Sequence, residues 1–275
     1  MVPELPALSR PASVSRRAIG EFAVKGHTVV RQLVTADELA PFRAAIESEI
    51  ERWAATAPPL ADRDTYHRAF VQVPNLWTRD ETVRRFVFAP RFASVAAELL
   101  GVDAVRLYHD QALCKEAGGG ATPWHQDQRY WPLDTDKTIT MWMPLVDVPA
   151  EVGTMSFANG SHERGELGPW TIGDESEVGF AELVERLGLE VATHGMLRAG
   201  DATFHAGWTL HRAPANPTRR DRPAMTIIWY ADGTRVGTVG PTNRFDHHAW
   251  LDRIPEGDLA AGPLNPRLWP PSRRE

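Results

Sequence analysis

The feature of this sequence that most constrains its fold is the change of residue pattern after Gly101, from helical spacing to short β-rich segments. From there the chain runs as short segments rich in β-branched and aromatic residues, which Gly, Pro and Asn separate. Strands at this density, interrupted only by one helix expected in the acidic stretch 171–190, indicate an antiparallel sandwich or jelly roll. The expected strands are Ala104–Lys115, Thr138–Val148, Thr154–Ala158, Ala202–Ala213 and Ala224–Tyr230.

The N-terminal part of the chain carries helix signals. Gly26–Val34 has the β-branched density of a strand. Thr35–Glu38 then fits a capping box, in which the Thr hydroxyl and the Glu carboxylate satisfy unpaired amides, and apolar spacing continues to about Trp53. A second helix is predicted over Arg91–Leu100 and ends at Gly101, because glycine tolerates the left-handed backbone of a helix C-cap. These helices are expected to pack outside the β core.

Length and composition favour one globular domain. The chain has 275 residues, of which 43% are hydrophobic and 24% charged, and β sandwiches and barrels of this size are commonly single domains. The predicted organisation is an N-terminal arm at 1–16, one domain at 17–251 and a C-terminal tail at 252–275. Within the domain, residues 17–103 are expected to form helices and strands that pack on the outside of a β core at about 104–232.

Charge and cysteine content exclude several classes of partner. The formal net charge is −6, and Lys and Arg are scattered except at Arg219, Arg220 and Arg222, so the basic surface of a nucleic-acid-binding protein is missing. The single cysteine, Cys114, cannot form an internal disulfide, and neither a signal-peptide pattern nor a membrane-spanning stretch is visible. We therefore expect a cytoplasmic protein that acts on a small molecule. The oligomeric state stays unknown.

The sharpest local motif is Trp124–Asp127, of sequence WHQD, which follows the glycine loop Gly118–Gly120. Residues i and i+2 of an extended segment point to the same side, so His125 and Asp127 can bind one metal ion together. A histidine and an aspartate at this spacing also occur by chance in surface turns. The motif alone leaves both interpretations open.

A third ligand has to come from a distant part of the chain to close one face of an octahedron. His211 is the candidate, since it ends the segment Trp208–His211 on a predicted strand that follows the tight turn Gly200-Asp201. Two histidines and one carboxylate with three open positions form the facial triad of non-haem iron(II) oxygenases. A lone histidine on an apolar strand is also a common core residue, and His205 competes for the same role.

Arg222 lies at the head of the predicted strand Pro223–Tyr230. A guanidinium there can hold a distal carboxylate through two parallel hydrogen bonds. The alternative is a solvated arginine in the basic turn Arg219–Arg222. The combination of this arginine with the three candidate ligands is far more specific than any one of these features.

Together these segments resemble the phytanoyl-CoA dioxygenase family over roughly residues 17–232. The resemblance implies a mainly β fold with flanking helices around a double-stranded β-helix core, of the jelly-roll, cupin-like type. It implies iron(II) bound by His125, Asp127 and His211, and the cosubstrate 2-oxoglutarate anchored by Arg222. The motifs that carry it are His125-Gln126-Asp127, Asn159-Gly160-Ser161-His162, Gly200-Asp201, and His211 through Pro214-Ala215-Asn216 to Arg222.

The same resemblance implies further pocket residues. Trp142 lies where the family's cosubstrate pocket has a tryptophan, whereas Gln72 lies where the family often has a lysine and so departs from the pattern. On the strand before the metal loop, Gln111 is a candidate for the cosubstrate and Lys115 for the substrate, with a solvent-facing position as the alternative. His162 is expected to belong to a structural turn rather than to the ligands.

Aromatic residues crowd the segments that carry the candidate ligands. Because aromatic surfaces commonly line ligand pockets, we predict that some of them form a wall for an organic substrate, foremost Tyr130, Trp131 and Trp208. Core packing is the alternative for each. The full group is Trp124, Tyr130, Trp131, Trp208 and Trp229.

The expected function is that of an iron(II), 2-oxoglutarate-dependent dioxygenase that consumes O2, releases succinate and carbon dioxide, and by default hydroxylates a small organic molecule. A bacterial natural product or metabolic intermediate is the expected substrate class. Two alternatives stay open at this point: a zinc hydrolase that uses the same ligands, and a non-catalytic β-barrel binding module that keeps the fold.

Overall fold

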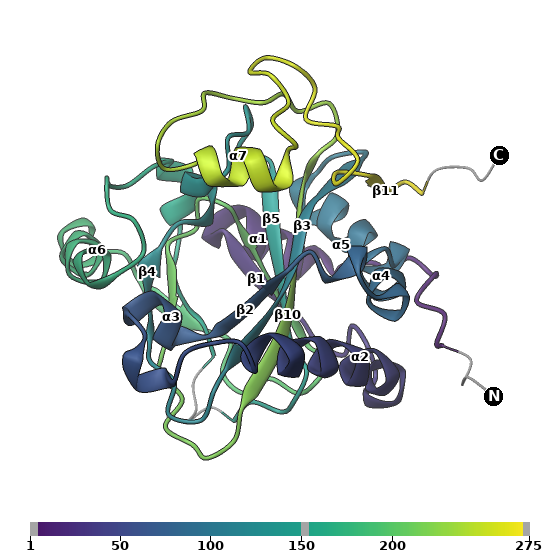
Figure 1. The fold of residues 1–275 in the computed structure, drawn as a ribbon. Coiled ribbons are helices and arrows are strands. Elements are labelled where there is room, and N and C mark those ends of the chain that lie inside the picture. Colours follow the sequence, from purple (N-terminus) through teal and green to yellow (C-terminus); the bar gives the residue numbers. More distant parts are fainter. Residues whose placement is uncertain (1–4, 150–153, 272–275) are drawn as a thin grey trace.

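The computed structural model describes residues 5–149 and 154–271 (Figure 1). Residues 1–4 of the predicted arm and 272–275 of the predicted tail lie outside the described residues. The helices are α1 (Arg16–Lys25), α2 (Ala36–Ala54), α3 (Thr65–Ala69), α4 (Glu81–Val87), α5 (Pro90–Leu100), α6 (Asp174–Leu187) and α7 (Arg244–Trp250), with 3-10 turns at Leu60–Asp62, Leu76–Thr78, Asp127–Tyr130 and Ser161–Arg164. The strands are β1 (His27–Val30), β2 (Val71–Pro74), β3 (Val105–Lys115), β4 (Thr122–His125), β5 (Thr138–Pro144), β6 (Ser156–Ala158), β7 (Val191–Thr193), β8 (Ala202–Ala206), β9 (His211–Ala213), β10 (Arg222–Ala231) and β11 (Arg267–Trp269).

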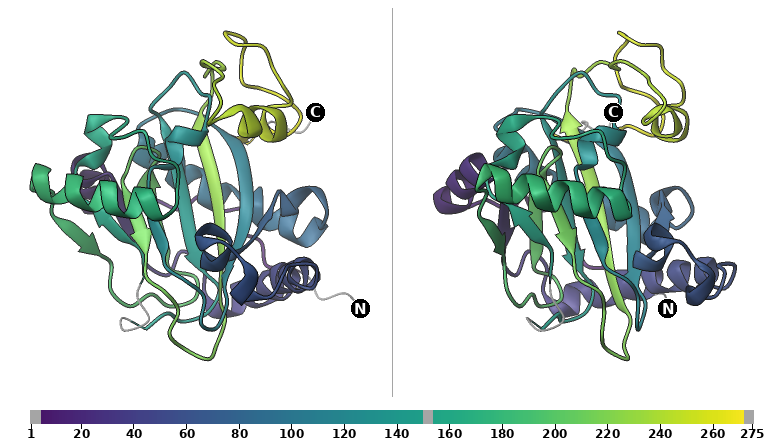
Figure 2. Two further views of the ribbon diagram at one scale, coloured as in Figure 1. Left: turned by 60° about the vertical axis from the view of Figure 1, so that its left-hand side comes forward. Right: turned by 90° about the vertical axis from the view of Figure 1, so that its left-hand side faces the viewer.

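Two antiparallel sheets form the core of the molecule. The larger, seven-stranded sheet has the order β1-β8-β5-β10-β3-β11, with β2 also paired to β3, and the smaller sheet has the order β4-β9-β6-β7. The sheets curl toward each other as the two sides of a double-stranded β-helix (Figure 2). The predicted fold class, mainly β with flanking helices and a jelly-roll core, is confirmed.

Helices cover the outer side of the larger sheet, where α2, α4 and α5 lie on one side of β2, β3 and β10 (Figure 1). Phe42 of α2, Phe86 of α4 and Phe92 of α5 are buried in one cluster with Met225 and Ile227 of β10. Burying each such side chain contributes roughly 1.5–3 kcal/mol. Helix α6 instead packs beside β4. In the described residues, no helix is long and apolar enough to cross a bilayer.

The long strands of the larger sheet divide their side chains between an inner cavity and the outer core. Successive residues of a strand point to opposite faces, so every second residue faces the cavity. Both faces are covered, which explains why β10 reads as a continuous buried run rather than as an alternating pattern. On β10 the cavity-facing set is Arg222, Ala224, Thr226 and Ile228, and the core set is Met225, Ile227 and Trp229.

The helix signals in the sequence are confirmed. Thr35 caps α2 with the reciprocal hydrogen bonds of a capping box, in which the Glu38 amide and carboxylate take part. Helix α5 ends at Gly101, whose φ of 66° is left-handed. The helix expected in the acidic stretch is α6.

One strand assignment from the sequence is wrong. The run Ala202–Ala213 is two strands on different sheets, β8 and β9, and residues Trp208 to Leu210 lie in the turn between them. The turn is tight because Gly207 packs against neighbouring polar groups: a Cβ there would lie 2.2 Å from Thr138 Oγ1. This crossing carries the chain from the larger sheet to the smaller one just before His211.

Candidate functional site

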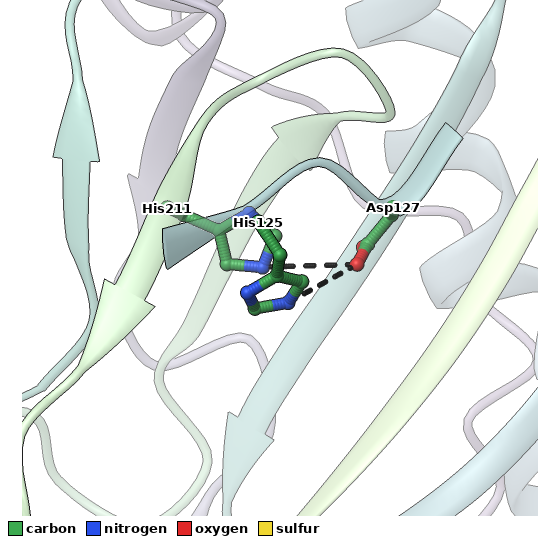
Figure 3. A group of neighbouring side chains, drawn as sticks. All are labelled: His125, Asp127 and His211. Atoms are coloured by element: carbon green, nitrogen blue, oxygen red, sulfur yellow. Dashed lines mark ion pairs between the residues drawn. The ribbon is translucent and has the colours of Figure 1, made fainter. Parts of the chain in front are cut away.

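The three candidate ligands converge on one point between the two sheets (Figure 3). His125 ends β4, Asp127 begins the following 3-10 turn, and His211 begins β9, directly opposite His125 in the strand pairing. The Asp127 Oδ1 atom lies 3.5 Å from His125 Nε2 and 3.8 Å from His211 Nε2. The ligand atoms of all three side chains lie within 4.8 Å of one another.

The backbone fixes which nitrogen of each histidine is available. His125 Nδ1 lies 2.8 Å from the carbonyl oxygen of Pro123, and His211 Nδ1 lies 2.9 Å from that of Thr209. A carbonyl only accepts hydrogen bonds, so each Nδ1 carries the proton and each Nε2 presents its lone pair toward Asp127. This is the arrangement that metal-binding histidines show in proteins.

The charge states of the site suit a divalent metal ion. Burial, together with His125 and His205, holds the pKa of His211 well below its usual value, so its ring is neutral. Burial opposes ionisation of Asp127, but the neighbouring histidines hold the pKa of its carboxyl well below the usual range. Two ligands at right angles, each about 2.1 Å from an ion, lie about 3 Å apart, so the two distances from Asp127 to the histidines need to shorten by less than about 1 Å on metal binding. The donor set therefore fits the ion that the sequence predicts.

His205 lies beside the triad and contacts Asp127, a partner that the sequence did not reveal. Its Nε2 atom is 3.2 Å from Asp127 Oδ2, and the Thr140 hydroxyl donates to the same oxygen at 3.0 Å. The His205 Nδ1 atom has no hydrogen-bond partner among the described residues, which places the proton on Nε2 as the donor to Asp127. His211, not His205, completes the group of three donors.

The residue between two of the candidate ligands also shapes the site. Gln126 is buried, and its amide nitrogen donates to the carbonyls of Trp208 at 2.7 Å and Gly165 at 2.9 Å. Its carbonyl oxygen accepts from the Leu167 amide. Gln126 thus ties the His125 loop to the turn before His211. Sequence reasoning assigned it no role, although its place in the motif is the signal that could have found it.

Other motif residues hold loops in place. Ser161 Oγ accepts a hydrogen bond from the Leu210 amide at 2.8 Å, next to His211. His162 lies in the same turn, 3.3 Å from the Ala23 carbonyl and away from the triad, as expected for a structural residue. The Asp201 carboxylate accepts from the Gln32 amide at 2.8 Å. The Asn159–His162 and Gly200-Asp201 motifs therefore connect strands and do not contribute donors to the triad.

A cavity of about 690 Å³ opens beside the triad. Of the residues predicted from the sequence, it is lined by Arg222, Trp142, Gln72, Gln111, Lys115, Tyr130 and Trp131, besides the three ligands. Trp208, which lies in the β8–β9 turn, does not line the cavity, and Trp124 and Trp229 are buried in packing clusters. Of the predicted aromatic wall, only Tyr130 and Trp131 therefore line the cavity; Trp208 is carried away by the crossing between β8 and β9, and Trp124 and Trp229 pack in the core.

One end of the cavity is cationic. Lys115 and Arg222 are direct partners in the pairing of β3 with β10, so both side chains project into the same end. Burial, and secondarily the charge of Arg222, lowers the pKa of Lys115 to about 7, and burial lowers the pKa of Arg222 to about 10. The guanidinium carbon lies 5.9 Å from the ring centre of Trp142.

Neighbouring polar groups shape this cationic end. Lys115 Nζ donates to the Thr122 hydroxyl at 3.1 Å. Asn216 Nδ2 donates to the Lys115 carbonyl at 3.1 Å and so ties β3 to the loop before β10. Gln72 and Gln111 are hydrogen-bonded to each other, and Gln72 accepts from the Tyr66 hydroxyl at 2.7 Å. The hydrogen-bonded side-chain amides of Gln72 and Gln111 therefore occupy the place where the family often has a lysine.

Comparisons with known proteins agree with this arrangement. A probable alpha-ketoglutarate-dependent hypophosphite dioxygenase of Stutzerimonas stutzeri is 24% identical over 247 residues, which cover 84% of this chain and 83% of the relative. The crystal structure of SnoK, an alpha ketoglutarate dependent carbocyclase from nogalamycin biosynthesis, is 25% identical, with a TM-score of 0.75 over 94% of this chain and 99% of SnoK. The epimerase SnoN, solved with Fe3+, alpha ketoglutarate and nogalamycin RO, is 28% identical, with a TM-score of 0.72 over 92% of this chain and 97% of SnoN. The profile of the phytanoyl-CoA dioxygenase family matches residues 22–224, and the chain belongs to this family of iron- and 2-oxoglutarate-dependent dioxygenases.

Proposed function

We propose that this protein oxidises a small organic molecule with iron(II), 2-oxoglutarate and O2, and that His125, Asp127 and His211 hold the iron. The observation that carries the proposal is the tautomeric arrangement of the site: both histidines donate from Nδ1 to backbone carbonyls and turn Nε2 toward one carboxylate oxygen. Such a donor set occupies one face of an octahedron and leaves the opposite face for a chelating cosubstrate and oxygen. When bound, iron with 2-oxoglutarate supplies the oxidising power, with succinate and carbon dioxide as by-products.

Arg222 and Lys115 are proposed to bind the distal carboxylate of 2-oxoglutarate, so Lys115, for which the sequence predicted a substrate contact, is now assigned to the cosubstrate because it lies opposite Arg222 in the strand pairing. Two buried basic side chains, side by side at one end of the cavity, favour an anion there, and a guanidinium binds a carboxylate through two parallel bonds. Trp142 packs beside the Arg222 guanidinium and limits its orientations. Gln72 and Gln111 add neutral donors and acceptors along the same wall.

The protein's own contribution is to orient and enclose the reactants. Thr140 and His205 hold Asp127 from the side opposite the ligand histidines, so one carboxylate oxygen, Oδ1, faces the metal position. Tyr130 and Trp131 present apolar surface in the cavity, which favours an organic skeleton over bulk water. We propose hydroxylation of a natural-product or metabolic intermediate as the reaction. The similarity to SnoK and SnoN supports the natural-product class.

Substrate-dependent release of succinate across a panel of metabolites tests this function, with the product identified by mass spectrometry. Each of His125→Ala, Asp127→Ala and His211→Ala is expected to abolish turnover, because it removes one donor of the metal site. The control is His248→Ala, which should retain activity. His248 is an exposed residue of α7 and does not line the cavity.

Other outcomes of the same assay identify the alternatives. Hydrolysis without succinate in a zinc-loaded sample would replace the oxygenase by a hydrolase. Failure to bind both iron and 2-oxoglutarate would show that the protein is a non-catalytic binding module. A product lighter by two hydrogens would keep the iron chemistry and replace hydroxylation by desaturation or ring closure.

A further inference from the structure

The two ends of the cavity differ in the charged groups that line them. β3 runs along its wall from Lys115 to His109, both of which line the cavity. At about 3.3 Å per residue, these two positions are about 20 Å apart. Lys115 and Arg222 form the cationic end, whereas the end at His109 lies under α7, since the His109 and Trp250 rings are 5.0 Å apart. Figure 1 shows α7 crossing that end of the larger sheet.

Helix α7 brings a carboxylate, Asp246, into the cavity lining at this second end. Its Oδ2 atom accepts a hydrogen bond from the buried Tyr108 hydroxyl at 3.3 Å, which fixes its position. Burial raises the pKa of Asp246 to about 7 despite hydrogen bonds from Tyr108 and Trp250. No Lys or Arg in the described part of the chain forms an ion pair with it.

The other charged groups of the lining do not compensate Asp246. Asp64, which precedes α3, is itself an anion, and its carboxylate is hydrogen-bonded to His67 at 2.7 Å. Arg212 is paired with Glu177 at 2.7 Å. Burial lowers the pKa of His109 to about 4, so this neighbour of α7 is neutral.

Aromatic side chains are frequent in the same lining. Phe245 and Trp250 of α7 line the cavity with Tyr66, Tyr130 and Trp131, and Trp250 packs in one cluster with Tyr130 and Trp131. Aromatic faces attract cations, and a carboxylate among aromatic rings is the combination that recognises organic ammonium groups. A hydroxyl group would offer Asp246 only a hydrogen bond, whereas an ammonium group would also stabilise the charged form that burial disfavours.

We propose that the substrate is an organic ammonium compound whose cationic nitrogen is held by Asp246 beside the aromatic rings of α7, with its carbon skeleton directed toward the metal triad. This inference rests on the proposed function in that it takes the cationic end of the cavity as the place of 2-oxoglutarate. It assigns substrate selection to α7, a helix that follows the matched family region, which ends at residue 224.

Binding of three matched probes tests the proposal on protein loaded with zinc(II) and 2-oxoglutarate. The probes are 2-naphthylethylamine, 2-naphthylethanol and 2-naphthylacetate, which share one skeleton and carry a cationic, a neutral or an anionic group. Titration calorimetry should show the ammonium probe binding at least about 10-fold more tightly than the alcohol, with the acetate weakest. Asp246→Asn, which keeps the side-chain shape without the charge, should weaken binding of the ammonium probe about 10- to 150-fold and abolish the preference.

Asp64→Asn is the matched control, because it neutralises another cavity-lining carboxylate and still caps α3. It should leave the three affinities unchanged, and Asp246→Glu should keep the preference for the ammonium probe. The proposal is overturned if the ammonium probe does not bind at about 1 mM, or binds no more tightly than the alcohol. It is also overturned if Asp246→Asn retains the preference.

The wild-type comparison alone decides the question if the Asp246→Asn variant does not fold. The two proposals fail separately. If the zinc-loaded protein prefers the ammonium probe but the iron-loaded protein releases no succinate with any compound of the metabolite panel, the oxygenase function is wrong. If succinate is released but the ammonium probe is not preferred, the role of Asp246 is wrong.

Discussion

At the scale of single residues, His205 is the position where the structure adds most to the site. Its ring is buried, with Nε2 3.2 Å from Asp127 Oδ2, so it acts on the metal site through Asp127. Replacing His205 by Phe keeps the ring volume and removes the donor. We expect metal affinity, measured by cobalt(II) titration, to fall about 10- to 100-fold, the range for partners that orient metal ligands.

The comparison variant for His205→Phe is His211→Ala, which should remove measurable cobalt binding. If the two variants lost binding equally, His205 would be a ligand. An affinity equal to that of the wild type would make His205 a packing residue.

At the scale of elements, the pairing of β3 with β10 sets the chemistry of the cosubstrate end, because it places Lys115 opposite Arg222. The pKa of Lys115 is lowered to about 7 by burial and by Arg222, so the free protein carries this charge only below that pH. A bound carboxylate favours the charged amine. Affinity for 2-oxoglutarate at saturating metal should therefore be highest below about pH 7 and fall, by at most about tenfold per unit, as the pH rises further.

Anaerobic titration of 2-oxoglutarate between about pH 6 and pH 9 measures this dependence. Lys115→Met should flatten the profile. Arg222→Ala should weaken binding about 10- to 150-fold across the range, because the pKa of Arg222, lowered by burial to about 10, keeps it charged throughout. If the affinity of Lys115→Met for 2-oxoglutarate still fell steeply with pH, another group would be responsible for the titration. If Arg222→Ala bound 2-oxoglutarate as tightly as the wild type, this arginine would have a purely structural role.

At the scale of the whole molecule, the site joins parts of the fold that meet only in the folded state. The ligands lie on β4, the following turn and β9, and the cosubstrate residues lie on the opposite sheet. Ligands that bind only the folded state stabilise it by about 2.7 kcal/mol at 100 times Kd. For a chain of this length, that corresponds to a rise in Tm of roughly 5 °C.

Thermal unfolding with nickel(II) and with nickel(II) plus 2-oxoglutarate checks this expectation. Each addition at about 100 times its Kd should raise Tm by a similar step, and 2-oxoglutarate without metal should give a smaller one. Asp127→Ala should lose the metal-dependent step. Equal stabilisation by 2-oxoglutarate with and without metal would show that the cosubstrate does not chelate the ion.

The sequence by itself determined the fold class, the helix caps and the candidate metal ligands. These depend on local signals: a capping box at Thr35, a left-handed C-cap at Gly101, and a histidine and an aspartate two residues apart at His125 and Asp127. The more distant candidates, His211 and Arg222, followed from combining spacings along the chain with a family pattern.

Only the tertiary structure decided what depends on the direction of a side chain in space. It split Ala202–Ala213 at Gly207, because the chain there changes sheets. That crossing left Trp208 outside the cavity, and the pairing of β8 with β5 put His205 beside Thr140, where both contact Asp127. It also brought Asp246, far along the chain and without a motif, over the end of β3, since long-range packing carries no signature in local residue patterns.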